Sequence, residues 1–308
     1  MIRRALLFAA LVTAMVMLAS GVALAVSCEI NDGDQFTNDR RVTVSFDTSG
    51  HAEYRVSNDY DLSGAAWQTA RSQYNDIDWT LDSGMASGDG EKTVYMQFRD
   101  GPNDNYLPHR CDDDIILDTK PPTTSLNGAP SYWVNHARVT LSATDASSLF
   151  SSGSGVERTE YAFNSSGPWQ HYSYGIEISD EDQAHIFYRS VDKAGNVEVA
   201  KDEDLKIDTV GPVCKAKSLT VRRGQWYVGL PYYVSDDHSS RVNAVISIKD
   251  YSGTTKKRFH EEAMTGYWWK YLWNRCTLPR GTYNIVVTGK DEAGNQQAIV
   301  GYATLRVR

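Results

Sequence analysis

The sequence predicts an all-β protein made of three tandem β-sandwiches that follow a cleaved signal peptide. Two observations predict this fold. Short segments of alternating apolar and polar residues run through the chain with almost no helical periodicity, and a turn motif recurs about every 90 to 100 residues. The 308 residues suffice for two or three domains. A composition of 41% hydrophobic and 23% charged residues permits globular packing and argues against extensive disorder.

Residues 1–25 have the features of a secretory signal peptide. Arg3 and Arg4 form a positive start, residues 5–20 carry no charge, and Ala23 and Ala25 supply the small side chains that a signal peptidase recognises. An uncleaved membrane anchor is the alternative, because about 20 apolar residues can span a bilayer. The small-residue site favours cleavage. We therefore expect a secreted protein, extracellular or associated with the cell envelope, with no membrane span in the mature chain.

Cys28 follows the predicted cleavage site, and two interpretations of it stay open. Residues 24–28 loosely resemble the lipobox of bacterial lipoproteins, whose cysteine is lipidated, but Ala25 stands where leucine is usual. In the other interpretation Cys28 forms a disulfide, because an even number of cysteines in a secreted chain suggests bridges. The four cysteines are Cys28, Cys111, Cys214 and Cys276. Lipidation of Cys28 would leave one of the others without a partner, which favours the disulfide.

A five-residue turn motif marks the end of each predicted sandwich. The sequence Asp-Lys-Ala-Gly-Asn at 192–196 recurs as Asp-Glu-Ala-Gly-Asn at 291–295, and a degraded copy stands at 100–103. Glycine and asparagine supply the positive φ that a tight turn between antiparallel strands needs. We expect strands on both sides of each turn, over 93–99, 114–117, 185–191, 205–207, 282–290 and 303–307.

A second repeat divides the chain into modules. Asp-Thr-Lys-Pro-Pro at 118–122 matches Asp-Thr-Val-Gly-Pro at 208–212. A strand that runs into proline leaves its sheet, because proline cannot donate to the ladder. The predicted boundaries are 1–25 for the signal peptide, 26–120 for module one, 121–210 for module two and 211–308 for module three. Each module has the size of an immunoglobulin-type sandwich.

Modules one and two share a third pattern. A Glu-Tyr pair at 53–54 and 160–161 begins a strand, and a Trp-Gln pair at 67–68 and 169–170 follows the next turn. We expect these tryptophans and tyrosines to be buried anchors of the sandwich cores. The best helical candidates are short, at 61–66 and 259–264.

The turn motif followed by a strand and then Asp-Thr-x-x-Pro resembles the Ig-like repeats of bacterial surface and secreted proteins. Module three also resembles the Ig-like domain of flagellar hook-capping proteins, through residues 278–283 and the turn at 250–253. The resemblance implies Ig-like or fibronectin-III-like β-sandwiches. It says little about function, because such modules serve as spacers, adhesins and enzyme accessories.

The module map favours one of the three possible disulfide pairings. Cys28 and Cys111 lie near the two ends of module one, and Cys214 and Cys276 both lie in module three. The expected bridges are therefore 28–111 and 214–276. Each would stabilise its module by roughly 4 kcal/mol in the chain-entropy model.

The charge balance and the motif inventory exclude several function classes. The net charge of −8 argues against a nucleic-acid binder, which normally carries a basic stripe. The chain has no GxSxG elbow, HExxH, phosphate-binding loop or GxGxxG, and its seven histidines show no ligand spacing. We therefore expect no enzymatic activity.

Calcium is the only cofactor that the sequence suggests. Hard cations prefer clustered carboxylate and carbonyl oxygens. The degraded turn of module one and the residues just after it are rich in such groups: Asp100, Asn103, Asp104, Asp112 and Asp113. The alternative is a set of solvated turn residues, since turns favour Asp and Asn for conformational reasons.

A dense aromatic segment in module three suggests a glycan site. If residues 267–273 form a strand, the odd-numbered side chains share one face and the even-numbered ones share the other. Exposed rings stack on the flat faces of sugars, and the candidates are Trp268, Trp269, Tyr271 and Trp273. The alternative is a core layer plus an interdomain contact.

These features favour a non-catalytic secreted or envelope-associated protein for binding or adhesion, with a surface protein or a polysaccharide as its partner. A structural spacer that holds another component away from the cell is the first alternative. A carbohydrate-binding accessory protein that uses the aromatic residues of module three is the second.

Overall fold

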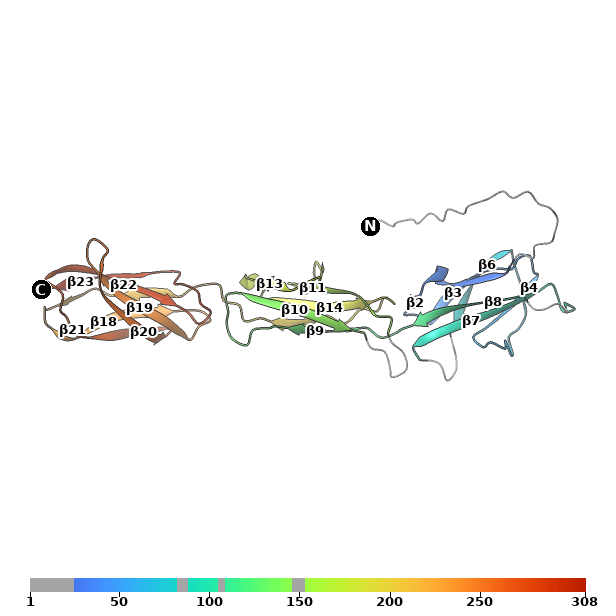
Figure 1. Ribbon diagram of the computed structural model, residues 1–308, viewed down its shortest axis with the longest axis horizontal. Helices are drawn as coiled ribbons and strands as arrows, with labels where there is room; N and C mark the ends of the chain where they lie inside the picture. Colours follow the sequence, from blue (N-terminus) through green and yellow to red (C-terminus); the bar gives the residue numbers. More distant parts are fainter. Residues whose placement is uncertain (1–24, 82–87, 105–108, 146–152) are drawn as a thin grey trace. The chain divides into compact units, whose positions relative to one another are not determined.

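The computed structural model describes residues 25–81, 88–104, 109–145 and 153–308 (Figure 1). The predicted signal peptide lies outside this part of the chain, apart from Ala25. The described residues form 23 β-strands and two 3-10 turns, Asn31–Gly33 and Glu181–Gln183, and contain no α-helix. The all-β prediction is therefore confirmed. Within the described ranges, no helix has the length and apolar character needed to cross a membrane.

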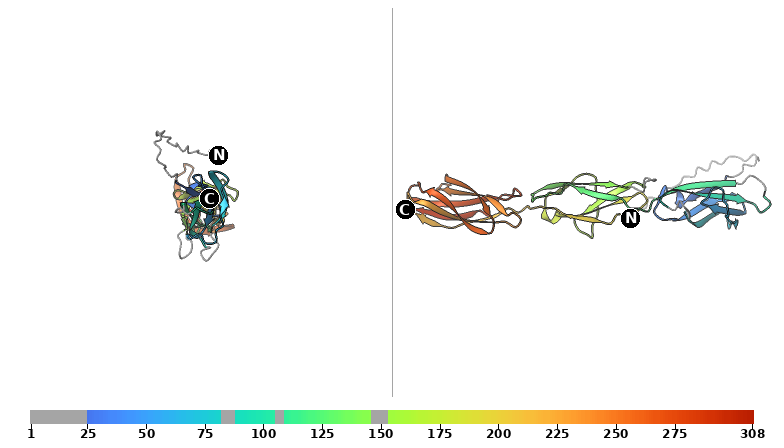
Figure 2. Two further views of the ribbon diagram at one scale, coloured as in Figure 1. Left: turned by 90° about the vertical axis from the view of Figure 1, so that its right-hand side faces the viewer. Right: turned by 90° about the horizontal axis from the view of Figure 1, so that it is seen from below.

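The chain separates into two compact units. One holds residues 1–35 and 40–115, and the other holds residues 36–39 and 116–308. Three hydrophobic cores lie within residues 30–115, 137–207 and 214–307. Each core is enclosed by its own strands, which can be told apart by colour in the right-hand view of Figure 2. The names module one, two and three are kept for residues 26–120, 121–210 and 211–308, whose boundaries stay a prediction.

Module one is a sandwich of a three-stranded and a five-stranded sheet. The three-stranded sheet has the order β1-β3-β6, with strands Ser27–Ile30, Arg41–Asp47 and Tyr74–Thr80. The second has the order β2-β8-β7-β4-β5, with strands Phe36–Thr37, His109–Leu117, Gly90–Arg99, Glu53–Ser57 and Gln68–Thr69. Strand β3 shows why the sheets pack: Val42, Val44 and Phe46 alternate inward and are buried.

Module two pairs a three-stranded sheet with a four-stranded one. The first has the order β13-β10-β9, with strands Ile176–Ile178, Ala137–Thr144 and Thr123–Asn127. The second has the order β12-β11-β14-β15, with strands Gln170–His171, Val156–Ala162, His185–Asp192 and Lys201–Asp204.

Module three is again a three-stranded sheet against a five-stranded one. The first has the order β16-β18-β21, with strands Val213–Ala216, Trp226–Ser235 and Tyr267–Arg275. The second has the order β17-β23-β22-β19-β20, with strands Leu219–Val221, Gly301–Val307, Gly281–Lys290, Arg241–Lys249 and Thr255–Met264.

The first strand of modules one and three switches between the two sheets. In module three, β16 pairs antiparallel with β18, and the next segment, β17, pairs parallel with the last strand, β23. In module one, β1 pairs with β3 and β2 pairs parallel with β8 in the same way. This switch joins both sheets by one continuous segment, as expected for tandem Ig-like sandwiches.

The expected core anchors are confirmed for the tyrosines and wrong for the tryptophans. Tyr54 is buried in the core of module one, and Tyr161 packs partly buried against the core of module two. Trp67 and Trp169 are half-buried outside the three cores. The guanidinium carbon of Arg99 lies 4.0 Å from the ring centroid of Trp67, and that of Arg189 lies 4.1 Å from the ring of Trp169. Each arginine also pairs with the glutamate of the pattern, Glu53 or Glu160. The repeated pattern therefore builds an Arg–Trp stack on a sheet surface.

The two helical candidates are also wrong. Residues 259–264 belong to β20, which alternates along the edge of its sheet, and residues 61–66 form turns. Strand β20 pairs with β19 over nearly its whole length, so cross-strand pairing decides the conformation of this segment.

One of the two expected disulfides is present. Cys28 on β1 is bonded to Cys111 on β8, with their Cα atoms 5.9 Å apart. The expected 214–276 bridge is absent, and both of its cysteines are buried thiols. Cys214 lies opposite Val234 at one end of β18, whereas Arg275, next to Cys276, lies opposite Trp226 at the other end. Eight residues of extended strand span about 26 Å, far beyond the reach of a disulfide.

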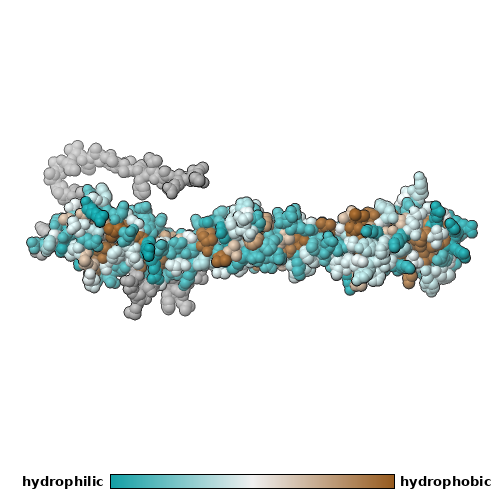
Figure 3. Space-filling model, turned by 180° about the vertical axis from the view of Figure 1, so that it is seen from behind, coloured by the Kyte–Doolittle hydropathy of each residue, from teal (hydrophilic) through white to brown (hydrophobic). Residues whose placement is uncertain are grey.

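The face of the molecule that Figure 3 displays is largely hydrophilic, with apolar side chains in small separate groups.

Candidate metal centres

The two complete turn motifs build the same hydrogen-bonded loop. In module two, the Asp192 carboxylate accepts the backbone N–H of Asn196 at 2.8 Å, and the Asp192 N–H donates to the Asn196 carbonyl. In module three, Asp291 accepts the N–H of Asn295 at 2.7 Å and donates back in the same way. The glycine of each motif has a φ above +90°, which explains why glycine stands there.

The asparagine of each loop holds the end of the preceding module. The Asn196 side-chain amide donates to the carbonyl of Asp118 at 2.8 Å, and that of Asn295 donates to the carbonyl of Asp208 at 2.8 Å. Asp118 and Asp208 are the aspartates of the two Asp-Thr-x-x-Pro segments, so the two sequence repeats meet in space. We call these two places the first junction and the second junction.

A third aspartate completes a carboxylate triad at each junction. Asp145 directly follows β10 and joins Asp118 and Asp192, and Asp236 directly follows β18 and joins Asp208 and Asp291. In each triad one oxygen from every carboxylate lies within 4.8 Å of the others. Two of the three aspartates are buried at each junction, and the third is half-buried.

The first triad is largely satisfied by hydrogen bonds within the protein. One Asp118 oxygen accepts the N–H of Ser154 at 2.7 Å, and the two Asp192 oxygens accept the backbone and side-chain N–H groups of Asn196. Asp145 accepts the N–H of Gly155 through one oxygen, while its other oxygen is buried without a partner. Burial raises the pKa of Asp145.

The second triad has two buried oxygens without a partner. Asp208 and Asp291 are 1% and 4% exposed, and the Oδ2 atom of each makes no hydrogen bond. The Oδ1 atoms are occupied by backbone N–H groups of Val210, Gly294 and Asn295. Burial, together with the negative charge of Asp236, raises the pKa of Asp208 to about 6. Buried carboxylate oxygens without a donor are costly, and a cation would compensate for this cost.

The donor set selects the class of metal. Each group consists of three carboxylates and includes no cysteine or histidine among the described residues, which suits a hard divalent cation. Calcium accepts six to eight oxygen ligands in flexible geometry. Carboxylates that bind through one or both oxygens supply part of that number, and carbonyls and water supply the rest.

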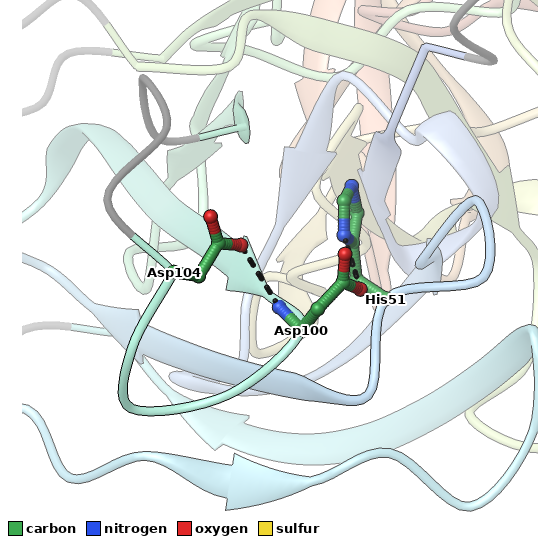
Figure 4. A group of neighbouring side chains, drawn as sticks. All are labelled: His51, Asp100 and Asp104. Atoms are coloured by element: carbon green, nitrogen blue, oxygen red, sulfur yellow. Dashed lines mark hydrogen bonds and ion pairs between the residues drawn. The ribbon is translucent and has the colours of Figure 1, made fainter.

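The calcium loop expected in module one is assembled only in part. Figure 4 shows Asp100 and Asp104 next to His51. The Asp100 N–H donates to Asp104 at 3.0 Å, and the Asp100 carboxylate is 2.9 Å from Nδ1 of His51. The Asp100 side chain is 69% exposed. In this cluster the carboxylates engage in hydrogen bonds on an exposed turn, and calcium binding there stays a prediction.

The predicted calcium site also included Asn103, Asp112 and Asp113. The structure does not bring their side chains into the His51 cluster. Asn103 stays in the same turn, while Asp112 and Asp113 lie on β8. Asp113 accepts the backbone N–H of Ile30 at 2.7 Å and so helps to join β8 to β1. Within the described ranges, neither aspartate belongs to a group of three metal-binding side chains.

Three of the four proposed glycan-binding residues face the core of module three, so their assignment needs correction. Trp273 is 6% exposed, and Trp269 and Tyr271 pack partly buried against the same core. The Trp269 indole N–H donates to the Met264 carbonyl at 2.9 Å. Trp268 lies on the outer face and is 45% exposed. The predicted alternation was correct, but the face with most of the rings is the inner one.

The sequence identified Asp118, Asp192, Asp208 and Asp291 as residues of turns and segment ends. It did not predict that Asp118 lies close to Asp192, or Asp208 to Asp291. It missed Asp145 and Asp236 altogether. The available signal was the recurrence of an aspartate at the same place in two pairs of motifs, one pair at each junction. Asp145 and Asp236 lie in dissimilar local sequences, so only the fold brings them into the triads.

Comparisons with known proteins give no family assignment. No family model and no curated protein matches the chain. Among solved structures, dimeric latent PorU from Porphyromonas gingivalis is 10% identical over 92% of this chain, with a TM-score of 0.24, and this chain spans 34% of its length. A tetra-tandem repeat from the extending region of a large adhesion protein is 13% identical, covers 92% of this chain and 74% of its own, and has a TM-score of 0.26. The FN1–FN3 domains of chicken CNTN1 are 11% identical, cover 91% and 98%, and have a TM-score of 0.28.

Proposed function

We propose that the chain is a non-catalytic extracellular binding or adhesion protein whose second junction is organised by calcium. The pair of partnerless oxygens in the second triad, Oδ2 of Asp208 and Oδ2 of Asp291, is the observation that carries the calcium part. Both oxygens are buried, both lie in a cluster of three carboxylates, and hard cations bind such groups.

The triads connect consecutive modules, which gives the metal a role. Asp208 belongs to the last segment of module two, and Asp236 and Asp291 belong to module three. A cation held by all three carboxylates would link the two modules through ionic bonds. Calcium would therefore couple the conformation of the junction to the calcium concentration outside the cell.

Thermal unfolding of the full chain tests this proposal. After metal removal, calcium and magnesium chloride are titrated separately at neutral pH. A ligand at a hundred times its Kd stabilises the site by about 2.7 kcal/mol, so we expect a rise in melting temperature of about 10 °C with calcium. The Asp208→Asn variant should lose most of this response.

Asp237→Asn is the matched control, because Asp237 is an exposed neighbour of Asp236 outside the triad. It should respond to calcium like the unaltered chain. An unchanged melting temperature of the unaltered chain with millimolar calcium would contradict the proposal. Equal loss of response in both variants would show that calcium acts through diffuse charge instead.

The location and the class of the protein rest on sequence features. The signal peptide features and the resemblance to Ig-like repeats of secreted proteins, including hook-capping proteins for module three, support export. The missing catalytic motifs support a binding role. A structural spacer is the second candidate, which a metal-linked junction also favours. Adhesion predicts saturable binding to a cell-surface component, and a spacer predicts none.

A further inference from the structure

We infer that the outer face of the sheet β16-β18-β21 in module three binds an acidic polysaccharide. This inference names a ligand class for the proposed binding function and does not depend on calcium at the junctions. It rests on an unequal charge distribution, on exposed lysines beside aromatic rings, and on a sheet without acidic residues.

The net charge of the whole chain conceals a strongly basic module. Residues 211–308 contain 15 lysines and arginines and only 7 aspartates and glutamates, a net charge of +8. Residues 26–210 contain 14 basic and 32 acidic residues, a net charge of −18. A polyanion is therefore attracted to module three and repelled by the rest of the chain.

The positive charge on this sheet is uncompensated. The three strands contain 23 residues and none of them is Asp or Glu. Lys215, Lys217 and Lys270 are exposed, and none forms an ion pair with a carboxylate in the part of the chain that the structure describes. Lys215 and Lys270 project from β16 and β21, and Lys217 directly follows β16.

Two of the lysines lie against two aromatic rings near one end of this face. Tyr233 and Trp268 stand opposite each other on β18 and β21, with ring centroids 5.5 Å apart. The Lys217 ammonium group is 4.0 Å from the centroid of Trp268, and that of Lys215 is 5.2 Å from the centroid of Tyr233. The face therefore presents rings and cations together.

The residues beside these two rings leave the outer face of the sheet open. Pro231 lies opposite Lys270, and Gly229 lies opposite Leu272, which is 66% exposed. A Cβ on Gly229 would lie 3.4 Å from the Lys270 side chain, which is an ordinary contact distance.

An acidic polysaccharide matches this combination. The apolar C–H face of a pyranose ring packs on an aromatic ring, and its carboxylate or sulfate accepts hydrogen bonds from lysine ammonium groups. A linear polymer can engage the two rings and the three lysines at once, because they lie close together on neighbouring strands. A neutral glycan would not use the lysines.

Binding of the full chain to polygalacturonate in metal-free, low-salt buffer tests the inference. The triple variant Lys215→Gln/Lys217→Gln/Lys270→Gln and the single variant Trp268→Ala should each weaken binding by about tenfold or more. The matched control removes three positive charges from the five-stranded sheet of the same module: Lys257→Gln/Arg258→Gln/Arg306→Gln. This control should change affinity by less than about threefold. Melting curves verify that each variant is folded, and the lysine variant keeps the test valid if Trp268→Ala unfolds.

Three results would overturn the inference. Equal weakening by both triple variants would indicate attraction by net charge alone. Binding of neutral dextran as tight as that of polygalacturonate would remove the role of the lysines. Equally tight binding of double-stranded DNA or phosphatidylglycerol vesicles, lost in the same variants, would indicate a general polyanion surface. Because no calcium is present, failure here leaves the calcium proposal intact, and failure of calcium to bind leaves this one intact.

Discussion

The first and second junctions have the same framework and differ in what their carboxylates bind. In both, an asparagine amide holds an aspartate carbonyl at 2.8 Å and the loop aspartate accepts the asparagine N–H. At the first junction, the second oxygens of Asp118 and Asp192 accept hydrogen bonds from Ser154 and Asn196. At the second junction, the corresponding oxygens of Asp208 and Asp291 have no partner. The comparison teaches that the same arrangement of loop and carboxylates can have its second oxygens satisfied by hydrogen bonds within the protein, as at the closed first junction. At the open second junction these oxygens stay free to bind a cation.

Asparagine substitutions in the two loop aspartates should have opposite effects on the metal-free chain. Both carboxylate oxygens of Asp192 accept hydrogen bonds from Asn196. In Asp192→Asn the new NH₂ group would face one of these N–H donors, so we expect the free energy of unfolding to fall by about 2 kcal/mol. Asp291→Asn keeps the Oδ1 acceptor, removes one charge from the triad, and gives Asp208 a donor. It should stabilise the metal-free chain by about 1 kcal/mol.

Chemical denaturation in metal-free buffer measures both differences. Adding calcium should reverse the order for Asp291→Asn, which would then be less stable than the unaltered chain. If both variants lose the same stability without metal, the proposed contrast between the closed and open junction is wrong.

The open junction should also control the pH dependence of the metal-free chain. The pKa of Asp208 is raised to about 6 by burial and by Asp236, whereas an unfolded aspartate titrates near 3.9. The folded chain thus holds a proton that the unfolded chain releases. The stability contributed by this group is full below about pH 4 and is lost as the pH rises through about 6, an effect of about 3 kcal/mol.

Denaturation midpoints between pH 4 and 7 measure this dependence. Asp208→Asn should flatten the slope in that window, because the substituted side chain does not titrate. With calcium bound the slope should reverse, since protons compete with the metal for the carboxylates. A slope that Asp208→Asn leaves unchanged would assign the dependence to other groups.

The asparagines should contribute unequally at the two junctions. Asn196→Ala removes the donor of the Asp118 carbonyl and of the second Asp192 oxygen, and should cost about 2 kcal/mol in the metal-free chain. Asn295→Ala removes only the donor of the Asp208 carbonyl and should cost about 1 kcal/mol. Denaturation of the two variants side by side measures this difference. Equal losses would mean that the bond between Asn196 and the second Asp192 oxygen contributes nothing to stability.

Local sequence was sufficient for most strands and turns and insufficient for contacts between distant segments. The alternation in β21 correctly separated its two faces, and the turn motifs fell between strands as expected. The strand expected at 205–207 is absent, because β15 ends at Asp204 and Ile207 forms only an isolated bridge with Val134. The 214–276 pairing failed because it considered only which cysteines share a module, whereas the position of each along β18 determines their separation. Similarly, Asp145 and Asp236 reach the triads through folding alone. The basic character of module three was visible in the sequence, but the charge of the whole chain concealed it.

The Cys28–Cys111 bond has a mechanical consequence. It connects the first and last long strands of module one, so a force that pulls on both ends of the chain passes from residue 28 to residue 111 through the covalent bridge. The 82 residues between them cannot be drawn out, although an open chain of that length would extend by about 280 Å. Module two contains no cysteine and module three holds two separate thiols, one of which, Cys214, has its pKa raised to about 11 by burial. Under tension only modules two and three can lengthen and absorb work, while module one acts as an inextensible end piece.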